Sequence, residues 1–292
     1  MLTILPYAPP VKPNVAGEAV VKAGKNIYTV GVGSGNNYSR KRASNVAGGT
    51  EKDRLQDGGI SYEWLGQSTM RITAAGGFVI YTDPVLLDAD PPPADLILIT
   101  HHHVDHCLPE FVAAVRKADT RLGAFHPSYV THCAQDIKGV RTVNIGQTVE
   151  FGPVRVTGVE AYARRGFHMK GQGCGFVIEV SGRRIYFSGD TSATEEMKDL
   201  RDIDVAIVSI CDNTYHINPE EVVEAVKGFS PRLFIPVHFT PVDEPDAVMT
   251  EGMFATKDPR FFTRKEDPGR FAPAFEGTGV ELVVLKKLVR FT

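Results

Sequence analysis

The sequence predicts an α/β fold, because short apolar runs of strand length lead into segments that begin like helices. Residues 94–99 and 233–238 are two such runs, and the second of them ends in a histidine. Residues 184–188 form a third run, which a glycine and an aspartate follow directly. Pro109 suits the first turn of a helix, and Asn218, with a proline after it, is a favourable N-cap. Open α/β sheets place their chemistry at the carboxyl ends of such strands.

The remaining elements follow from the same patterns. A helix after Asn218 should bury Val222, Val223 and Val226, which recur at helical spacing. The dipeptide Ser181-Gly182 should close a hairpin between two neighbouring strands. Besides the three runs above, strands are expected at residues 142–145, 154–159, 175–180 and 280–285.

Residues 1–59 differ in character from the rest of the chain. They contain little periodic apolar pattern, no histidine and no cysteine, and only residues 27–30 resemble a strand. We interpret them as an extended arm that packs on the domain or on a second subunit of a homo-oligomer, with simple disorder as the alternative. Residues 60–292 then form the main domain, because 292 residues with 42% hydrophobic content can bury one large core.

Charge and composition narrow the classes of partner. A net charge of −3 provides no general attraction to nucleic acid or to an anionic membrane, and no apolar run approaches the length of a membrane span. The N-terminus lacks the basic and apolar regions of a secretory signal. The four cysteines (Cys107, Cys133, Cys174 and Cys211) have no paired spacing, so we expect reduced thiols and a cytoplasmic protein.

The segment after residues 94–99 carries the strongest functional signal. Residues 101–106 read His-His-His-Val-Asp-His. In an extended segment alternate side chains point the same way, so His101 and His103 can converge on one ion while His102 faces away. Asp105 and His106 are adjacent, so a turn is needed for both to face a second ion. Such crowding of imidazoles predicts a metal site on a strand-to-helix loop.

Other strand ends supply further ligands. Asp190 follows residues 184–188 and can bridge two cations, and His238 closes residues 233–238. We choose His168 as the remaining ligand, because the hairpin should place it beside Asp190. His126, which follows an apolar run, is its main rival, and His132 and His216 are weaker ones.

These motifs together resemble the metallo-β-lactamase-fold metal-dependent hydrolases, in the family's order and over residues 60–240. Within that superfamily the chain is most similar to the phosphorylated-ascorbate lactonase branch, through residues 167–171, 213–215 and 219–221. The resemblance implies a four-layer αββα sandwich with a dinuclear site at one edge of its two sheets. The matching motifs are residues 64–69, residues 82–84, the histidine cluster, His168, residues 188–191 and residues 236–238.

The expected ligand assignment uses all seven of these side chains. One ion takes His101, His103 and His168; the other takes Asp105, His106 and His238; Asp190 bridges them. Two such ions lower the pKa of a bound water and polarise the group under attack. The resemblance further implies that Asp105 can move a proton. Mixed imidazole and carboxylate ligands suit zinc, manganese or iron.

Substrate recognition rests on fewer signals. Arg164, Arg165 and Lys170 flank His168, and Tyr215 and His216 lie on another expected rim loop. They can hold a phosphate or carboxylate, although a merely solvated loop explains the two arginines equally well. The sequence thus predicts hydrolysis of a small, anionic ester, lactone or phosphodiester. The alternatives are a metal-dependent nuclease, an iron-binding oxidoreductase of the same fold, and a non-catalytic metal-binding scaffold.

Overall fold

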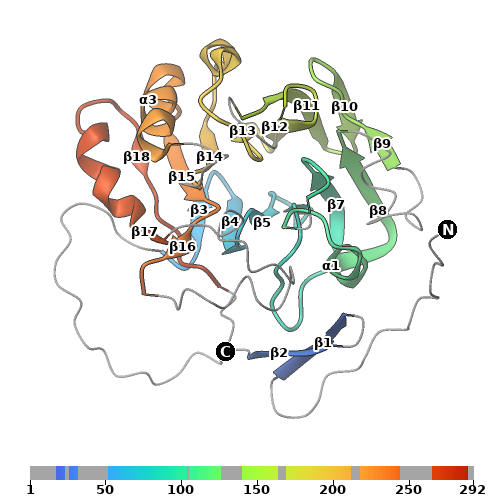
Figure 1. The fold of residues 1–292 in the computed structure, drawn as a ribbon. Coiled ribbons are helices and arrows are strands. Elements are labelled where there is room, and N and C mark those ends of the chain that lie inside the picture. Colours follow the sequence, from blue (N-terminus) through green and yellow to red (C-terminus); the bar gives the residue numbers. More distant parts are fainter. Residues whose placement is uncertain are drawn as a thin grey trace.

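The fold was analysed in a computed structural model, which describes part of the chain. The described residues are 18–23, 26–31, 52–103, 105–125, 140–163, 169–211, 218–243 and 265–288. Two facing seven-stranded sheets form the centre of the molecule (Figure 1). Two further pairs of strands are β1 (Glu18–Ala23) with β2 (Asn26–Gly31), antiparallel, and β16 (Thr240–Pro241) with β17 (Lys265–Glu266), parallel.

The first sheet has its strands in chain order. Strands β3 to β6 pair antiparallel, whereas β6 to β9 pair parallel. Its strands are β3 (Leu55–Asp57), β4 (Ile60–Gly66), β5 (Thr69–Thr73), β6 (Val79–Thr82), β7 (Ala94–Ile99), β8 (Arg116–Ala124) and β9 (Val140–Thr142).

The second sheet repeats this plan. Strands β10 to β13 pair antiparallel, and β13, β14, β15 and β18 pair parallel. Its strands are β10 (Thr148–Phe151), β11 (Val154–Ala161), β12 (Gly173–Val180), β13 (Arg183–Phe187), β14 (Val205–Ser209), β15 (Leu233–Val237) and β18 (Glu281–Leu282).

Helices cover the outer face of each sheet, which gives the expected αββα layering. Helix α1 (Pro109–Val115) packs on the first sheet. Helix α3 (Pro219–Phe229) covers the second sheet, flanked by the 3-10 helices η1 (Glu195–Asp199) and η3 (Pro268–Phe275). Among the described residues, no helix is long and apolar enough to cross a membrane.

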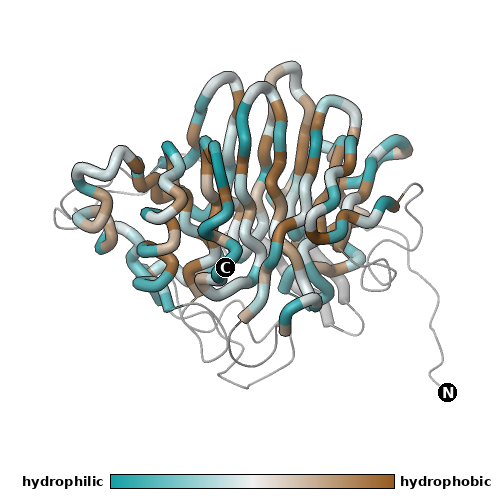
Figure 2. Tube along the Cα trace, turned by 90° about the horizontal axis from the view of Figure 1, so that it is seen from above, coloured by the Kyte–Doolittle hydropathy of each residue, from teal (hydrophilic) through white to brown (hydrophobic). Residues whose placement is uncertain are grey.

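The core fills the space between the two sheets. Along β7, Leu96 and Leu98 belong to the central cluster that both sheets share, whereas Ile97 and Ile99 pack toward α1. A strand buried on both faces explains why residues 94–99 read as a continuous apolar run. Figure 2 shows hydrophobic residues running along the central strands of the sandwich.

Most expected elements are confirmed. Helix α1 begins at Pro109, and the Asn218 side chain caps α3 by accepting hydrogen bonds from two backbone N–H groups. The hairpin at Ser181-Gly182 is present, with φ of +50° and +73° at its two residues. Val222, Val223 and Val226 are buried as expected.

Three expected strands differ in extent. The strand expected at 142–145 is β9, which ends at Thr142. The one expected at 280–285 shortens to the two-residue edge strand β18. The strand expected at 27–30 is β2, which pairs locally with β1. Strand β3 already belongs to the first sheet, so the sheet begins before residue 60.

The expectation of four reduced thiols is wrong at Cys107. This residue is buried and disulfide-bonded, whereas Cys174 and Cys211 are free and buried. A disulfide sulfur has no thiolate to offer a metal, so Cys107 is excluded as a ligand although it follows His106 directly. The argument from cysteine usage to a reducing compartment is correspondingly weaker.

Candidate metal centre

The candidate ligands come from three strand ends at one edge of the sandwich. His101 follows β7 of the first sheet, whereas Asp190 and His238 follow β13 and β15 of the second. The nearest atoms of His106 and Asp190, one from each sheet, are 3.3 Å apart. Parallel strands present their carboxyl ends at a common edge, which is why segments distant in sequence meet here.

A tight turn makes the histidine cluster converge. The carbonyl of His103 accepts hydrogen bonds from the N–H groups of His106 and Cys107, both at 2.9 Å. This turn breaks the strand alternation, so Asp105 and His106 point to the same place. Asp105 Oδ2 lies 3.8 Å from His106 Nε2 and 3.6 Å from His238 Nε2.

The donor atoms form two overlapping groups. His101, His106 and Asp190 make one group, and Asp105, His106 and His238 make the other, with donor atoms within 4.8 Å of one another in each. His106 Nε2 is 3.1 Å from His238 Nε2. Asp190 Oδ1 is 3.3 Å from His106 Nε2 and 3.4 Å from His238 Nε2, a position that suits a bridging carboxylate.

The other two histidines of the cluster lie at its margin. The ring of His103 is edge-on to that of His101, with centroids 4.7 Å apart, but His103 belongs to neither donor group. His102 is exposed and contacts the ring of His103 from outside. This arrangement places His103 beside the first group and His102 away from both.

A buried carboxylate behind the ligands orients their rings. Asp83 follows β6 with φ of +41° and has no exposed surface. It accepts hydrogen bonds from Thr100 N (2.8 Å) and Thr100 Oγ1 (2.7 Å), and its Oδ2 lies 2.8 Å from His106 Nδ1. Thr100 Oγ1 in turn lies 2.9 Å from His101 Nδ1.

These contacts determine which ring nitrogen faces the site. Because the carboxylate of Asp83 can only accept, His106 Nδ1 carries the proton. The hydroxyl of Thr100 donates its hydrogen bond to Asp83, so its oxygen accepts one from His101 Nδ1. Both imidazoles therefore turn Nε2 toward the site, as metal-binding histidines do when a carboxylate holds their other nitrogen.

His238 is held by both backbone and side chains. Its backbone, with φ of +62°, donates a hydrogen bond from N to the carbonyl of Gln67 (2.9 Å). Its ring is stacked on that of His106, with centroids 5.1 Å apart, and Cys211 is among the groups that raise its pKa. A non-glycine residue in a left-handed conformation beside a functional group is typical of a constrained site.

Without a metal, the buried imidazoles and carboxylates neutralise one another. Burial alone lowers the pKa of His106, but the carboxylates of Asp190 and Asp105 outweigh it and raise that pKa to about 10. His238 follows the same logic, since Asp190 raises its pKa against burial. For Asp105 burial raises the pKa, but His106 and His238 bring it below its usual range. An ion must therefore displace protons to bind.

Two glycines allow the loops to approach. Gly189 has φ of +58°, and a Cβ there would lie 3.0 Å from the Thr100 side chain. Gly173 passes so close that a Cβ would lie 3.3 Å from His101 Cβ. The residue before Asp190 is therefore held to glycine by conformation and by space.

Comparison with known proteins identifies the family. The family model described as "Beta-lactamase superfamily domain" matches residues 61–238, which span the candidate ligands. The chain belongs to this superfamily. The match ends at His238, so the matched region contains every candidate ligand.

Among its relatives are proteins named UPF0173 metal-dependent hydrolases. One from Rubrobacter xylanophilus is 31% identical over 202 residues, covering 62% of this chain and 82% of the relative. One from Symbiobacterium thermophilum is 34% identical over 196 residues, covering 62% and 84%. A solved structure from Parabacteroides distasonis, named as a metal-dependent hydrolase, superposes with a TM-score of 0.62 at 26% identity, covering 78% of this chain and 93% of its own. The chain is a metal-dependent hydrolase of this superfamily.

Several predicted site residues of this hydrolase lie outside the described residues. Their flanks nevertheless approach the site. Ala163 is buried, Gly173 lies against His101, and the N–H of Cys174 donates to the Thr100 carbonyl at 3.3 Å. The backbone carbonyl of Tyr162 also accepts from Ser192 N at 2.9 Å, next to the Asp190 loop. The predicted residues outside the described ranges are His126, His168, Arg164, Arg165, Tyr215 and His216.

Lys170 is described and is engaged with acids. Its ammonium pairs with Glu196, lies 3.5 Å from Glu160, and sits 5.3 Å from the centre of the Tyr162 ring. Tyr162 OH donates to Glu196 as well, at 2.9 Å. Lys170 thus links the segment after residue 168 to η1, and two carboxylates offset its charge.

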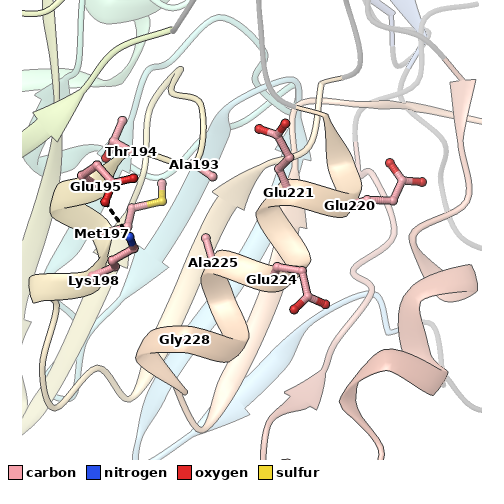
Figure 3. Close-up of a pocket in the computed structure, with 10 residues that line it drawn as sticks. All are labelled: Ala193, Thr194, Glu195, Met197, Lys198, Glu220, Glu221, Glu224, Ala225 and Gly228. Carbon is pink, nitrogen blue, oxygen red and sulfur yellow. Dashed lines mark hydrogen bonds and ion pairs between the residues drawn. The ribbon is translucent and has the colours of Figure 1, made fainter.

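The groove between η1 and α3 lies apart from the candidate ligands. It encloses 540 Å³ and contains none of the candidate ligands. Figure 3 shows Glu220, Glu221 and Glu224 on α3, on the opposite side of the groove from Glu195 and Lys198 of η1. Three of these acids are ion-paired: Glu220 with Arg270, Glu224 with Lys227 and Glu195 with Lys198.

The sequence reasoning did not assign roles to Asp83, Gln67 or Cys211. The first two stood inside the family motifs, at residues 82–84 and 64–69. The signal for Asp83 was present, because it closes the apolar strand β6 just as Asp190 and His238 follow theirs. Gln67 and Cys211 carry no such pattern, and only the fold places them beside the ligands.

Proposed function

We propose that this hydrolase uses two divalent ions, held at the candidate centre, to cleave a small anionic ester, lactone or phosphodiester. The observation that carries the proposal is the pair of overlapping donor groups at the common edge of the two sheets. They contain five of the seven ligands that the sequence predicted: His101, Asp105, His106, Asp190 and His238.

The donor set fits such ions. Zinc, manganese and iron accept both imidazole nitrogen and carboxylate oxygen. Ligands at about 2.0–2.2 Å around one ion lie roughly 3.0–3.5 Å from each other. The measured separations of 3.1 Å between His106 and His238, and of 3.3 and 3.4 Å from these to Asp190, match that spacing.

In this proposal His168 binds the same ion as His101 and His103, and Asp190 is shared with the other ion. The support comes from its neighbours, since residues on both sides of 164–168 contact the His101 and Asp190 loops. His126 follows β8, which is parallel to β7, so it remains the rival. Zinc, manganese and iron all suit a site of three imidazoles and a shared carboxylate.

The roles of the two acids follow from their exposure. When bound, the ions would lower the pKa of a coordinated water and polarise the substrate group under attack. The Asp190 side chain is 1% exposed and lies 3.3 Å from His106 and 3.4 Å from His238. This position suits a carboxylate that bridges the two ions. The Asp105 side chain keeps 25% of its surface exposed, so it alone of these acids reaches an incoming substrate. Its exposed carboxylate is placed to accept a proton from the attacking water and pass it to the leaving group.

The anionic substrate class rests on basic residues that lie close in sequence to a predicted ligand or to α3. Arg164 and Arg165 precede His168, and Tyr215 and His216 precede the N-terminus of α3. Lys170 is paired with Glu196, so it is the weakest of these donors. A lactonase-like activity on a phosphorylated or carboxylated substrate agrees with these groups.

The first experiment measures metal and activity together. Protein purified without chelators is analysed for zinc, manganese and iron, and is then screened against lactones, esters and phosphodiesters. We expect two ions per chain and hydrolysis of an anionic member. Trace metal only, with no gain on reloading, contradicts the proposal. Cleavage of DNA or RNA instead would favour the nuclease alternative.

The second experiment decides the disputed ligand. His168→Ala should lower metal content and activity together, whereas His126→Ala should lower neither. The two variants are matched, since each removes a single imidazole that the sequence offers as a ligand. The opposite pattern transfers the ligand role to His126.

The third experiment tests whether Arg164 recognises the negative charge of the substrate. Arg164→Ala should reduce kcat/KM for an anionic substrate far more than for an uncharged analogue, with metal content unchanged. Lys170→Ala serves as the matched control, because its charge is already offset. Equal losses on both substrates would show that Arg164 supports the loop only.

The arm and the location of the protein remain proposals of the same kind. We propose that the residues before β3 mediate subunit contact and that the protein is cytoplasmic. A chain starting at Lys52 should keep its metal while changing its oligomeric state, because it retains the Lys52–Leu285 bridge and every strand of the two main sheets. Loss of metal from that folded truncation would defeat the first of these proposals.

A further inference from the structure

Gln67 occupies a constrained position at the metal centre. It lies in the tight connection between β4 and β5, with φ of +50°, and is only 3% exposed. Its backbone carbonyl accepts hydrogen bonds from His238 N at 2.9 Å and from Trp64 Nε1 at 2.8 Å. The strand connection is thereby tied directly to a candidate ligand, and the side chain has little freedom to leave.

The side-chain amide reaches two donors of the second group. Gln67 Nε2 is 2.9 Å from His238 Nε2 and 3.1 Å from Asp105 Oδ2. Ligands at about 2.1 Å lie roughly 3.0 Å apart in octahedral and 3.4 Å apart in tetrahedral geometry. The head of Gln67 therefore stands where a further ligand of the same ion would stand.

The other end of the amide shows which atom belongs there. Gln67 Oε1 is buried and, within the described part of the chain, has no hydrogen-bond partner. An amide N–H cannot bind a cation, whereas an amide oxygen is a good ligand for hard divalent ions. A half-turn of the carboxamide exchanges the two atoms without moving the rest of the side chain.

We propose that Gln67 is a further ligand of the ion shared by Asp105, His106 and His238, through its amide oxygen. This inference rests on the proposed two-metal function and deepens it. An added oxygen ligand raises the coordination number of that ion above the three protein donors. Such a site favours manganese or iron(II), which accept five or six ligands, over closed tetrahedral zinc.

The test is a cobalt(II) titration of metal-free protein with visible absorption as the readout. The d–d band reports coordination number, so the result does not depend on activity. Wild type is compared with Gln67→Met, which keeps the size and removes the oxygen, and with Gln67→Glu, which keeps an oxygen. Gln147→Met, at an exposed glutamine on the β9–β10 connection, is the matched control. Circular dichroism of each metal-free variant monitors the fold.

We expect wild type and Gln147→Met to bind two cobalt ions per chain with the same spectrum. Gln67→Met should bind one of the two about tenfold or more weakly, with a stronger band from lower coordination, and Gln67→Glu should restore binding. If Gln67→Met fails to fold, Gln67→Asn, whose amide is set back by one methylene, should show the same weakening.

Three results would overturn the inference. Unchanged constants and spectrum in Gln67→Met would show that the amide is no ligand. Tighter binding in that variant would show that the amide competes with the ion. Failure of Gln67→Glu to restore binding would exclude an oxygen ligand. A wild type that binds fewer than two ions refutes the proposed function itself, which separates the two failures.

Discussion

Replacing Asp83 by asparagine should uncouple the ligand rings from their support. Asp83 Oδ2 receives the hydroxyl of Thr100 at 2.7 Å and faces His106 Nδ1 at 2.8 Å. An amide NH₂ placed there would donate to both atoms. Thr100 would then donate to His101, so both imidazoles would carry their proton on Nε2, where the ion must bind. A change of one atom thus reverses two tautomers.

The magnitude follows from these contacts. Loss of a carboxylate behind a metal-bound histidine costs about 10–100-fold in metal affinity, or roughly 1.4–2.8 kcal/mol. Two of the three hydrogen bonds to Asp83 end on Oδ2 in a fully buried site, so the metal-free protein should also lose about 2–4 kcal/mol of stability.

The assay combines isothermal titration with zinc and thermal unfolding of the metal-free protein. Asp95→Asn is the matched control, because Asp95 also accepts a backbone N–H, from Val79 at 2.8 Å, but lies at the start of β7 away from the ligands. That variant should keep wild-type metal affinity. If Asp83→Asn binds two zinc ions as tightly as wild type, the carboxylate does not set the tautomers and the reasoning fails.

Further predictions follow from pKa, backbone conformation and capping. Because the metal-free pKa of His106 is raised to about 10 and that of His238 is also raised, metal binding should release protons and tighten as pH rises. Protonated His106 stabilises the metal-free fold fully below pH 6.5, so its melting temperature should fall as pH rises toward 10; a flat or rising profile contradicts the shift. Gly189→Ala should cost about 1–3 kcal/mol and lower metal affinity, whereas Gly76→Ala, with φ of +88° in open space, should cost stability only. Asn218→Ala should cost about 1 kcal/mol in denaturant unfolding by removing the α3 cap, with metal content unchanged.

Local chemistry was enough to predict much of this molecule. The apolar run of residues 94–99 is β7, because a strand buried on both faces must be apolar throughout. Asn218 and Pro109 marked the starts of α3 and α1, since caps depend on neighbours in sequence. The crowding of imidazoles at residues 101–106 indicated a metal site before any contact was known. Family resemblance then supplied the αββα layering.

Only the tertiary structure decided how these pieces combine. The turn at His103 aims Asp105 and His106 at one point, and the meeting of the two sheets brings His106 within 3.3 Å of Asp190. Burial of Asp83 and the 2.9 Å approach of Gln67 to His238 have no periodic signature, because they depend on contacts between segments far apart in the chain. For the same reason the pairing of Lys170 with Glu196 on η1 could not be predicted from the sequence. Residue types and their spacing determined which metal-binding side chains are available. Packing of the two sheets determined which of their donor atoms lie close together.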